Sequence, residues 1–457
     1  MIDFVSTIKS SHLSLSLSPL QSAAESTLRV LSTRWKNLWL TVPSLLLNCH
    51  NFPYRQDEVI LSFFDRLLEF DPDSRLLKVK LECGGSEDID GLRDRISTVI
   101  QRGPQHLDVE SFTEYRDDDD DNFLYPFIDY MPLNLYTSKT LVSLTLTFSG
   151  LGDPGFVSMP CLKFMTLVKV HFRYAANLEK LVSGCPVLED LTLIRNMDPI
   201  LVGSDENTMR VRSGSLKRFR VPLSHGKDCS SFVKCTLEFD APVLEHMTLG
   251  EDHYDIIVVK NLTSLFTVDL DIKFVVEFGV FFDPGDLSKR NEIRYFLSGM
   301  SGVRHMIISE KTVKALELYS NVGMIPKFNN LSRLEAVFPF KLLQFLPAFL
   351  ECCPNLKHLI LEVYYSREME DAFALMNVPQ CFLSTLECVQ LKRIHEWEEE
   401  EMKVATFFLE NAAVLKKLTL SLTNYPRYVF DEEIFEEVNK VTKRSPTCQI
   451  LLDWDLC

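Results

Sequence analysis

The 457-residue sequence lacks the short motifs that carry most enzyme chemistry. Glycine is scarce, with 17 residues, and neither G-x-G-x-x-G nor G-x-x-x-x-G-K-[ST] occurs, which argues against a phosphate-binding loop. H-E-x-x-H and G-x-S-x-G are also missing, so the sequence offers neither a zinc-protease helix nor a nucleophile elbow. We therefore expect no active site and no cofactor.

Long basic stretches and long apolar runs are missing as well. The formal net charge is −16, and a net anion repels a phosphate backbone, so we expect no nucleic-acid partner. No apolar run reaches the roughly 18 residues of a transmembrane helix. The serine-rich start lacks the continuous apolar core of a signal peptide. We therefore expect neither a membrane segment nor secretion.

Twelve cysteines are present, but no C-x-x-C pair or regular spacing. The adjacent Cys352 and Cys353 suit neither a zinc site nor a disulfide framework. Reduced, mostly buried thiols are typical of proteins in reducing compartments. The cysteine usage therefore predicts a cytoplasmic and/or nuclear protein without a metal site.

Leucine is abundant and recurs in an L-x-x-L-x-L pattern. From Leu141 onward, successive copies begin 21, 26, 28, 28 and 21 residues apart, which is the spacing of leucine-rich repeats. The x-L-x-L piece predicts a short strand with alternate side chains on one face. Intervening segments such as 178–182 predict returning helices. The copies are Leu76/Val79/Leu81, Leu141/Leu144/Leu146, Leu162/Met165/Leu167, Leu188/Leu191/Leu193, Leu216/Phe219/Val221, Leu244/Met247/Leu249, Leu265/Val268/Leu270, Leu356/Leu359/Leu361, Leu386/Val389/Leu391 and Leu415/Leu418/Leu420.

A single repeat cannot bury its own leucines, so neighbouring repeats must stack. The predicted fold is therefore an α/β leucine-rich-repeat solenoid, a horseshoe with a parallel sheet on its concave side. An irregular α/β globule with leucine-rich strands is the alternative.

Helical patterns precede the repeats. Ser22 and Glu25 have the spacing of a capping box, and an apolar stripe with two tryptophans follows up to Pro43. This stripe faces either the core or a partner. Further helices are predicted over 57–68 and 92–100, the second leading to a strand at 107–109.

Two acidic runs and the histidines could suggest metal chemistry. Consecutive residues on a helix point in every direction, so Glu398 to Glu401 cannot converge on one ion, and we predict a solvated helix start. Asp117 to Asp121 predicts an acidic loop. We interpret His358 and His395 as surface or packing residues.

The segments 185–191 and 353–359 both read C-P-x-L-x-x-L. This motif resembles the repeat junctions of the plant F-box/LRR/FBD protein family. The segment Val30 to Trp39, V-L-S-T-R-W-K-N-L-W, resembles the second half of the F-box. That helical module binds the Skp-type adaptor of cullin–RING ubiquitin ligases. The segment Val378 to Trp454 resembles the FBD domain.

The first residues depart from the family's pattern. The family's F-box begins with a Leu-Pro pair and an aliphatic helix, and Met1 to Leu17 has neither. Either the module is degenerate here or the sequence does not begin at its natural start.

The resemblance implies three parts: a partial F-box-like helical segment over 1–50, a repeat array over 51–375 and an FBD domain over 376–457. It implies a non-catalytic scaffold, the substrate-recognition subunit of an SCF-type E3 ubiquitin ligase. The partners would be a Skp-type adaptor, its cullin complex and an unidentified protein substrate. The alternative is a protein-binding scaffold that has lost adaptor binding. The expected adaptor-binding residues are Val30, Leu31, Trp35, Leu38 and Trp39.

Overall fold

The computed structural model describes residues 14–17, 44–48, 64–65, 68–69, 76–84, 89–112, 131–195, 208–222, 236–250, 256–274, 283, 285–364, 375, 377–394, 399–423 and 431–455. The chain forms two compact units, Met1–Leu216 (unit 1) and Lys217–Cys457 (unit 2).

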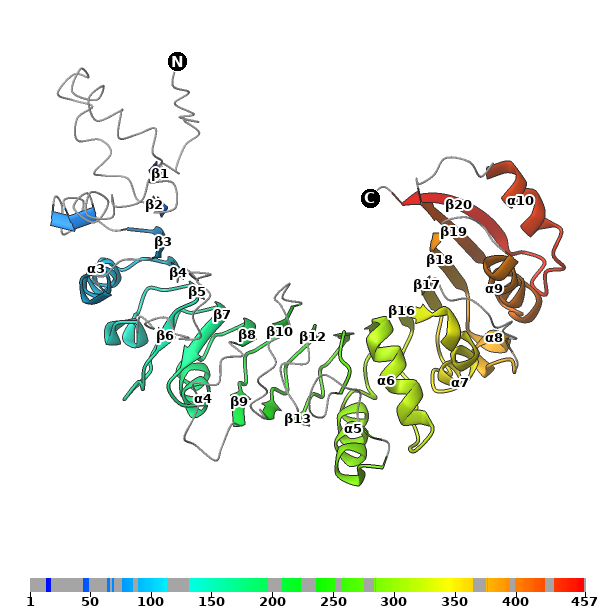
Figure 1. The fold of residues 1–457 in the computed structure, drawn as a ribbon, viewed down its shortest axis with the longest axis horizontal. Helices are drawn as coiled ribbons and strands as arrows, with labels where there is room; N and C mark the ends of the chain where they lie inside the picture. The colour runs from blue at the N-terminus through cyan, green and yellow to red at the C-terminus, as the bar shows by residue number, and fades with distance from the viewer. Residues whose placement is uncertain are drawn as a thin grey trace, which may run out of the picture. The chain divides into compact units, whose positions relative to one another are not determined.

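Unit 1 is built on parallel strands that pair in the order β1, β2, β3, β4, β5, β7 and β8, with β6 beside β7. The helices α3 and α4 lie on one side of these strands (Figure 1). The strands are β1 (Ser14–Leu17), β2 (Ser44–Asn48), β3 (Lys78–Gly84), β4 (His106–Phe112), β5 (Ser143–Thr147), β6 (Gly150–Leu151), β7 (Phe164–Phe172), β8 (Asp190–Arg195) and β9 (Thr208–Arg212). The helices are α3 (Ile89–Gln101), the 3-10 helix η4 (Leu133–Thr137) and α4 (Ala176–Ser183).

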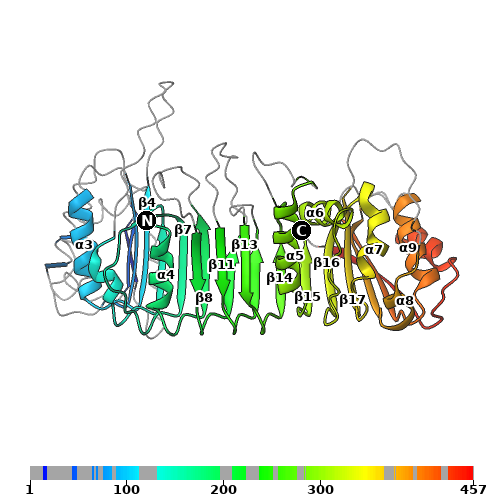
Figure 2. The same cartoon turned by 90° about the horizontal axis from the view of Figure 1, so that it is seen from below.

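Unit 2 repeats this arrangement with a parallel ladder in the order β10, β12, β14, β15, β16, β17, β18, β19 and β20. Figure 2 shows strands of this ladder standing side by side, with helices such as α7 and α9 alongside them. The strands are β10 (Arg218–Val221), β11 (Thr236–Asp240), β12 (His246–Leu249), β13 (Ile256–Asn261), β14 (Thr267–Leu270), β15 (His305–Ile308), β16 (Arg333–Pro339), β17 (His358–Tyr364), β18 (Cys388–Ile394), β19 (Lys417–Thr423) and β20 (Gln449–Asp455). The helices are α5 (Leu287–Gly299), α6 (Glu310–Ser320), the 3-10 helix η5 (Phe340–Phe345), α7 (Leu346–Leu350), α8 (Gln380–Ser384), α9 (Glu399–Asn411) and α10 (Asp431–Asn439).

The core of each unit lies under its ladder. Every apolar position of the repeats predicted from the sequence is buried. In unit 2 these positions align in register, for example Met247 beside Val268 and Leu359 beside Val389. Burying such a side chain contributes about 1.5–3 kcal/mol relative to leaving it exposed. The α/β repeat fold is therefore confirmed, while the horseshoe form stays a prediction.

The C-P-x-L junctions form the same tight turn in both copies. The Leu188 amide donates to the Cys185 carbonyl at 3.1 Å, and the Leu356 amide donates to the Cys353 carbonyl at 3.2 Å. Proline favours the second position of such turns because its φ is already fixed. Each cysteine is buried, and its Sγ contacts the carbonyl four residues earlier in the preceding helical segment. The motif thus ends the preceding helical segment and turns the chain toward the next strand.

Gly184 precedes the first of these junctions and lies against Val157. A Cβ added at Gly184 would lie 2.3 Å from Val157 Cγ1 and 2.7 Å from the Val157 carbonyl oxygen. Only glycine fits this approach without a shift of the neighbouring backbone.

The prediction of returning helices is confirmed at α4, which includes 178–182, but is wrong between 208 and 261. There the returning segments are the strands β9, β11 and β13. Met209 and Val211 of β9 are buried on alternate positions, and in β11 the apolar Leu237 and Phe239 alternate with polar residues, although Glu238 between them is buried as well. This period-two pattern favours a strand over a helix.

Two repeats were missed by the sequence analysis. They are Val303/Met306/Ile308, which leads into β15, and Leu331/Leu334/Ala336, which leads into β16, and all six side chains are buried. Four of these six positions carry valine, methionine, isoleucine or alanine in place of leucine, so a leucine pattern does not reveal the two repeats.

The predicted helix over 92–100 and strand over 107–109 are confirmed as α3 and β4. In the predicted helix over 57–68, the described Phe64 and Leu68 are helical and buried. None of the described helices is long and apolar enough to cross a membrane. The predicted helix over 22–39, the acidic loop 117–121 and His395 lie outside the described residues.

The acidic run at the start of α9 corrects one expectation. Glu401 is only 7% exposed, so this part of the run is not solvated as we predicted. Glu401 lies in the first turn of α9 and packs inward with the apolar side of the helix, where Val404 and Ala405 are also buried.

Candidate functional site

The face of each ladder opposite the leucines is the candidate functional site. Successive side chains of a strand point to opposite faces, so the residues between the buried leucines lie together on the other face. In β16, for example, Arg333 is exposed and Glu335 is half-buried, while Leu334 and Ala336 between and after them are buried. Parallel, in-register pairing then aligns equivalent residues of neighbouring strands in rows.

The first row in unit 2 consists of the first residue of each ladder strand, and we call it the leading row. It contains no acidic residue, and most of its members are arginine, lysine or histidine. His246, Arg333, His358 and Lys417 are exposed. In strand order the leading row is Arg218, His246, Thr267, His305, Arg333, His358, Cys388, Lys417 and Gln449.

Glu335 connects two members of the leading row. Its Oε1 lies 3.0 Å from His305 Nε2, and it accepts from Arg333 Nε at 3.1 Å and Nη2 at 3.0 Å. Burial raises the pKa of the Glu335 carboxyl, but the hydrogen bonds and charges of Arg333 and His305 outweigh it, and the pKa lies below its usual value. Glu335 is therefore held as a carboxylate that positions both cationic side chains.

Asp269 lies on the same face in β14, two residues after the leading row. Burial raises the pKa of its carboxyl, and the negative charges of Asp271 and Glu335 raise it further, while His305 acts in the opposite direction. Asp269 thus lies where negative charge is disfavoured, close to the ring of His305. Polar groups of both signs are therefore gathered on strands β14 to β16.

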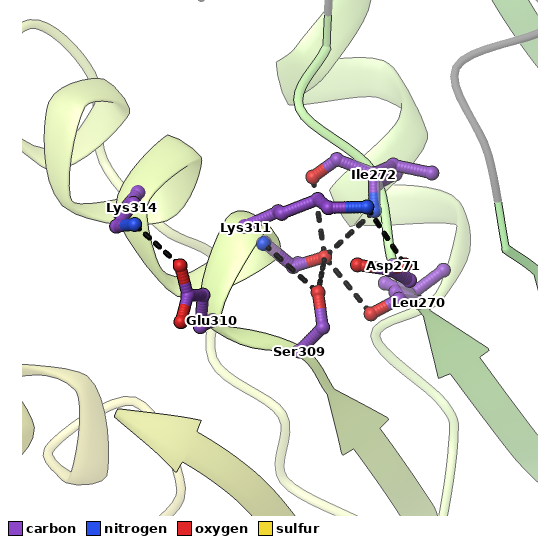
Figure 3. A network of polar contacts seen from close by, with 8 residues as sticks. Leu270, Asp271, Ile272, Ser309, Glu310, Lys311 and Lys314 are labelled. Carbon is purple, nitrogen blue, oxygen red and sulfur yellow. Dashed lines mark hydrogen bonds and ion pairs between the residues drawn. The ribbon is translucent and has the colours of Figure 1, made fainter. Parts of the chain in front are cut away.

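Beyond the end of β14, a polar network fixes the start of α6 (Figure 3). The hydroxyl of Ser309 caps the helix by accepting from the Thr312 amide at 3.4 Å. Thr312 is fully buried, and its Oγ1 accepts from the Ile272 amide at 2.9 Å and donates to the Leu270 carbonyl at 2.9 Å. Lys311 Nζ reaches Asp271 at 3.2 Å. The network therefore joins two successive repeats at the edge of the candidate surface.

Unit 1 carries a shorter charged patch on the equivalent face. Lys80 Nζ lies 2.6 Å from Glu82 Oε1 and 3.8 Å from Asp108 Oδ2 on the next strand. The pKa of Asp108 is raised by burial, which outweighs the attraction of Lys80. The first residues of β3 and β4 are Lys78 and His106, so these two strands also begin with a basic residue.

This arrangement offers hydrogen bonds and charge along several strands. Burial raises the pKa of the Cys185 and Cys381 thiols to about 12 and that of Cys353 well above its usual value, so these thiols stay protonated. Within the described ranges, no group of three or more His, Cys, Asp or Glu side chains could hold a metal ion. An extended polar surface of this kind suits a protein or peptide ligand.

The expected adaptor-binding residues Val30, Leu31, Trp35, Leu38 and Trp39 lie outside the described residues. Of the histidines discussed from the sequence, His358 is exposed as predicted, and it is a member of the leading row. The leading row itself was missed. The leading row consists of the residue immediately before the second apolar position of each repeat. That these residues are mostly basic can be seen only when all the repeats are aligned.

Comparison with known proteins gives two family models and several relatives. The model described as "FBD" matches residues 376–420, and that described as "FBD-associated F-box protein At5g56370, LRR repeats" matches residues 121–269. FBD-associated F-box protein At5g27750 of Arabidopsis thaliana is 57% identical over 429 residues, 93% of each chain. F-box/FBD/LRR-repeat protein At1g13780 of the same plant is 56% identical over 454 residues, 98% of each chain. No solved structure matches the chain significantly.

Proposed function

Because the chain belongs to the plant F-box/FBD/LRR-repeat family, we propose that it is the substrate-recognition subunit of an SCF-type cullin–RING ubiquitin ligase. The observation that supports this function is the in-register polar face over a continuous leucine core. Such a face presents many side chains at fixed spacing, as a protein-binding scaffold requires. Ubiquitin transfer would be carried out by partner subunits, and this chain would act by raising the effective concentration of the target.

Adaptor binding is assigned to the N-terminal motif. We propose that Val30, Leu31, Trp35, Leu38 and Trp39 contact a Skp-type adaptor, which would recruit the cullin complex. The motivation is the V-L-S-x-R-W-x-x-L-W pattern together with the family's F-box names.

The test is retention of the full chain on a purified Skp-type adaptor at micromolar concentration. We expect the wild type to be retained and Trp35→Ala and Trp39→Ala to be retained less. Tyr295→Ala removes an aromatic side chain that is 66% exposed on α5 and is the matched control, with unchanged retention. Circular dichroism separates loss of binding from loss of the helix. Tryptophan variants that are folded and fully retained would disprove the assignment.

The second candidate is a repeat scaffold without ligase coupling. It is favoured by one observation, the absence of a Leu-Pro pair and aliphatic helix in Met1 to Leu17. A folded wild-type chain that the adaptor does not retain would support this candidate over the first.

Three further proposals concern organisation. The helices that cover one face are wider, at about 10 Å, than the strand spacing of about 4.8 Å, so we propose that the array curves into a horseshoe, which small-angle scattering would test. We also propose domain boundaries after residues 50 and 375, testable by limited proteolysis. Reduced cysteines and the ligase role favour the cytoplasm and/or nucleus, testable with a fluorescent fusion of the chain.

A further inference from the structure

The leading row of unit 2 gathers positive charge along one edge of the ladder. His305, Arg333 and His358 lie side by side on three consecutive strands, β15, β16 and β17. Neighbouring strands are about 4.8 Å apart, and like charges placed directly opposite each other destabilise a sheet. Glu335 contacts two of these side chains, and the exposed His358, Lys417 and His246 add further hydrogen-bond donors to the same row.

The opposite edge of the same face carries three carboxylates, and its one basic residue, Lys392, lies beside Glu362. Asp271, Glu362 and Asp453 lie four residues after the leading row in their strands or just beyond the strand end. Two of these carboxylates have cationic partners outside both edges: Asp271 meets Lys311 at 3.2 Å, and Glu362 meets Arg393 at 2.9 Å. The acidic edge is thus partly neutralised by residues that do not belong to the leading row.

The ligand that complements the leading row is a line of carboxylates. Arg333 already donates to Glu335 through Nε and Nη2, so the ligand would rely mainly on the other basic members of the row. A lysine ammonium attracts a carboxylate, and a histidine ring N–H donates to a carboxylate in either tautomer. From β12 to β19 the row crosses six strand spacings, roughly 29 Å. An extended chain advances about 3.3 Å per residue, so roughly nine residues would span it.

We propose that the leading row of unit 2 binds an extended segment of a partner protein that is rich in aspartate and glutamate and that crosses the strands from β12 to β19. The proposal rests on the proposed role of the ladder face in target binding, but not on coupling to a ligase. A peptide suits the face better than a nucleic acid, because phosphates follow one another without a break and would meet the carboxylates of the opposite edge, whereas a peptide can place neutral residues there.

The test uses the full chain and fluorescence anisotropy. The probe is a labelled twelve-residue peptide of alternating glutamate and serine. The controls are a lysine–serine peptide of the same length and a single-stranded oligonucleotide of equal charge. We expect the glutamate peptide to bind, its affinity to fall with added salt, and both controls to bind at least tenfold more weakly.

Variants locate the site. Arg333→Gln, His358→Gln and Lys417→Gln, combined, change three exposed members of the leading row. The matched control combines Lys327→Gln, Lys341→Gln and Lys440→Gln, three exposed lysines outside the ladder strands. We expect the first variant to lose about tenfold or more in affinity for the glutamate peptide, about 1.4 kcal/mol, and the second less than twofold.

Several outcomes would overturn the proposal: no binding of the glutamate peptide, tighter binding of the oligonucleotide, or equal losses in the two variants with unchanged melting temperatures. The same preparations are tested on the Skp-type adaptor. Adaptor retention without peptide binding disproves the leading-row proposal alone. Peptide binding without adaptor retention supports the leading row and disproves ligase coupling.

Discussion

The buried hydroxyl of Thr312 is predicted to hold the turn that leaves β14, and Thr312→Val tests it. Valine keeps the shape of threonine but removes the hydroxyl. In the wild type, Oγ1 accepts from the Ile272 amide at 2.9 Å and faces the Leu270 and Ile272 carbonyls at 2.9 and 3.2 Å (Figure 3). Thr312 has no exposed surface, so water cannot replace these bonds without a rearrangement.

The size of the destabilisation depends on which backbone groups lose a hydrogen-bond partner. The Leu270 carbonyl keeps a bond from the Ser309 amide at 3.0 Å, so its loss is partial. The Ile272 amide loses the hydroxyl oxygen that accepts its hydrogen bond, and an unsatisfied buried donor costs about 1–3 kcal/mol. We expect a local destabilisation of about 2 kcal/mol. Repeat arrays can unfold one segment at a time. The destabilisation should therefore be measured in the segment around Ile272.

The assay is native-state hydrogen exchange of the peptide that contains Ile272. A loss of about 2 kcal/mol corresponds to about 30-fold faster exchange of that amide. Thr312→Ser keeps the hydroxyl and should change this exchange much less. Thr263→Val removes an exposed hydroxyl that donates to the Pro242 carbonyl at 3.2 Å and should leave Ile272 protected. Equal protection of Ile272 in wild type and Thr312→Val would refute the reasoning.

Three further predictions concern other parts of the molecule. Gly184→Ala should lower the melting temperature of unit 1, since the added Cβ meets backbone 2.7 Å away; an unchanged melting temperature would show that the neighbouring loop yields freely. Iodoacetamide should modify exposed Cys161 in the native protein and leave Cys353 unmodified until denaturation, because burial raises the pKa of Cys353. Mass spectrometry identifies the modified cysteines, and labelling of Cys353 in the native protein would contradict its burial. Because its cationic partners lower the folded pKa of Glu335, its stabilisation is present above the ordinary carboxyl pKa and is lost as pH falls through the folded value. The difference in melting temperature between wild type and Glu335→Gln should therefore vanish on acidification from neutral pH, and a constant difference would refute this.

The repeat fold was predictable because its strongest determinant is the burial of alternate leucines, and the spacing of these leucines can be seen directly in the sequence. Leu356, Leu359 and Leu361 are each at most 1% exposed. The repeat that contains Ala336 was missed because alanine fills the same core position without a leucine signal. The returning strands between 208 and 261 were missed because we expected the same returning helix in every repeat. The sequence around Leu237 and Phe239 nevertheless alternates apolar and polar residues, as a strand does.

The candidate surface was harder to predict for a physical reason. Exposed positions such as Arg333 and His358 carry no hydrophobic period, and their proximity depends on the register of strands 25 residues apart in the sequence. The leucines determine that register, but only an alignment of all the repeats shows which exposed residues become neighbours. The adaptor-binding prediction rests on sequence alone, since Trp35 and Trp39 lie outside the described residues.

The segment that matches the FBD model continues the ladder that precedes it. It includes β18 and β19, and β18 pairs with β17 from His358 beside Cys388 to Glu362 beside Lys392. The Lys357 carbonyl also accepts from the Glu387 and Cys388 amides at 2.9 and 3.0 Å. In a repeat array each unit is stabilised mainly by its neighbours, so the strand before this segment relies on it for hydrogen bonds and for cover over its leucines.

This continuity bears on how the proposed peptide ligand would be held. The leading row passes from His358 on β17 through Cys388 on β18 to Lys417 on β19 without a change of register. A ligand that follows the row therefore crosses from the repeats into the FBD segment on one continuous sheet. Because parallel pairing fixes the spacing across this junction, the two segments would act as a single recognition surface, and selection for a target would act on both at once.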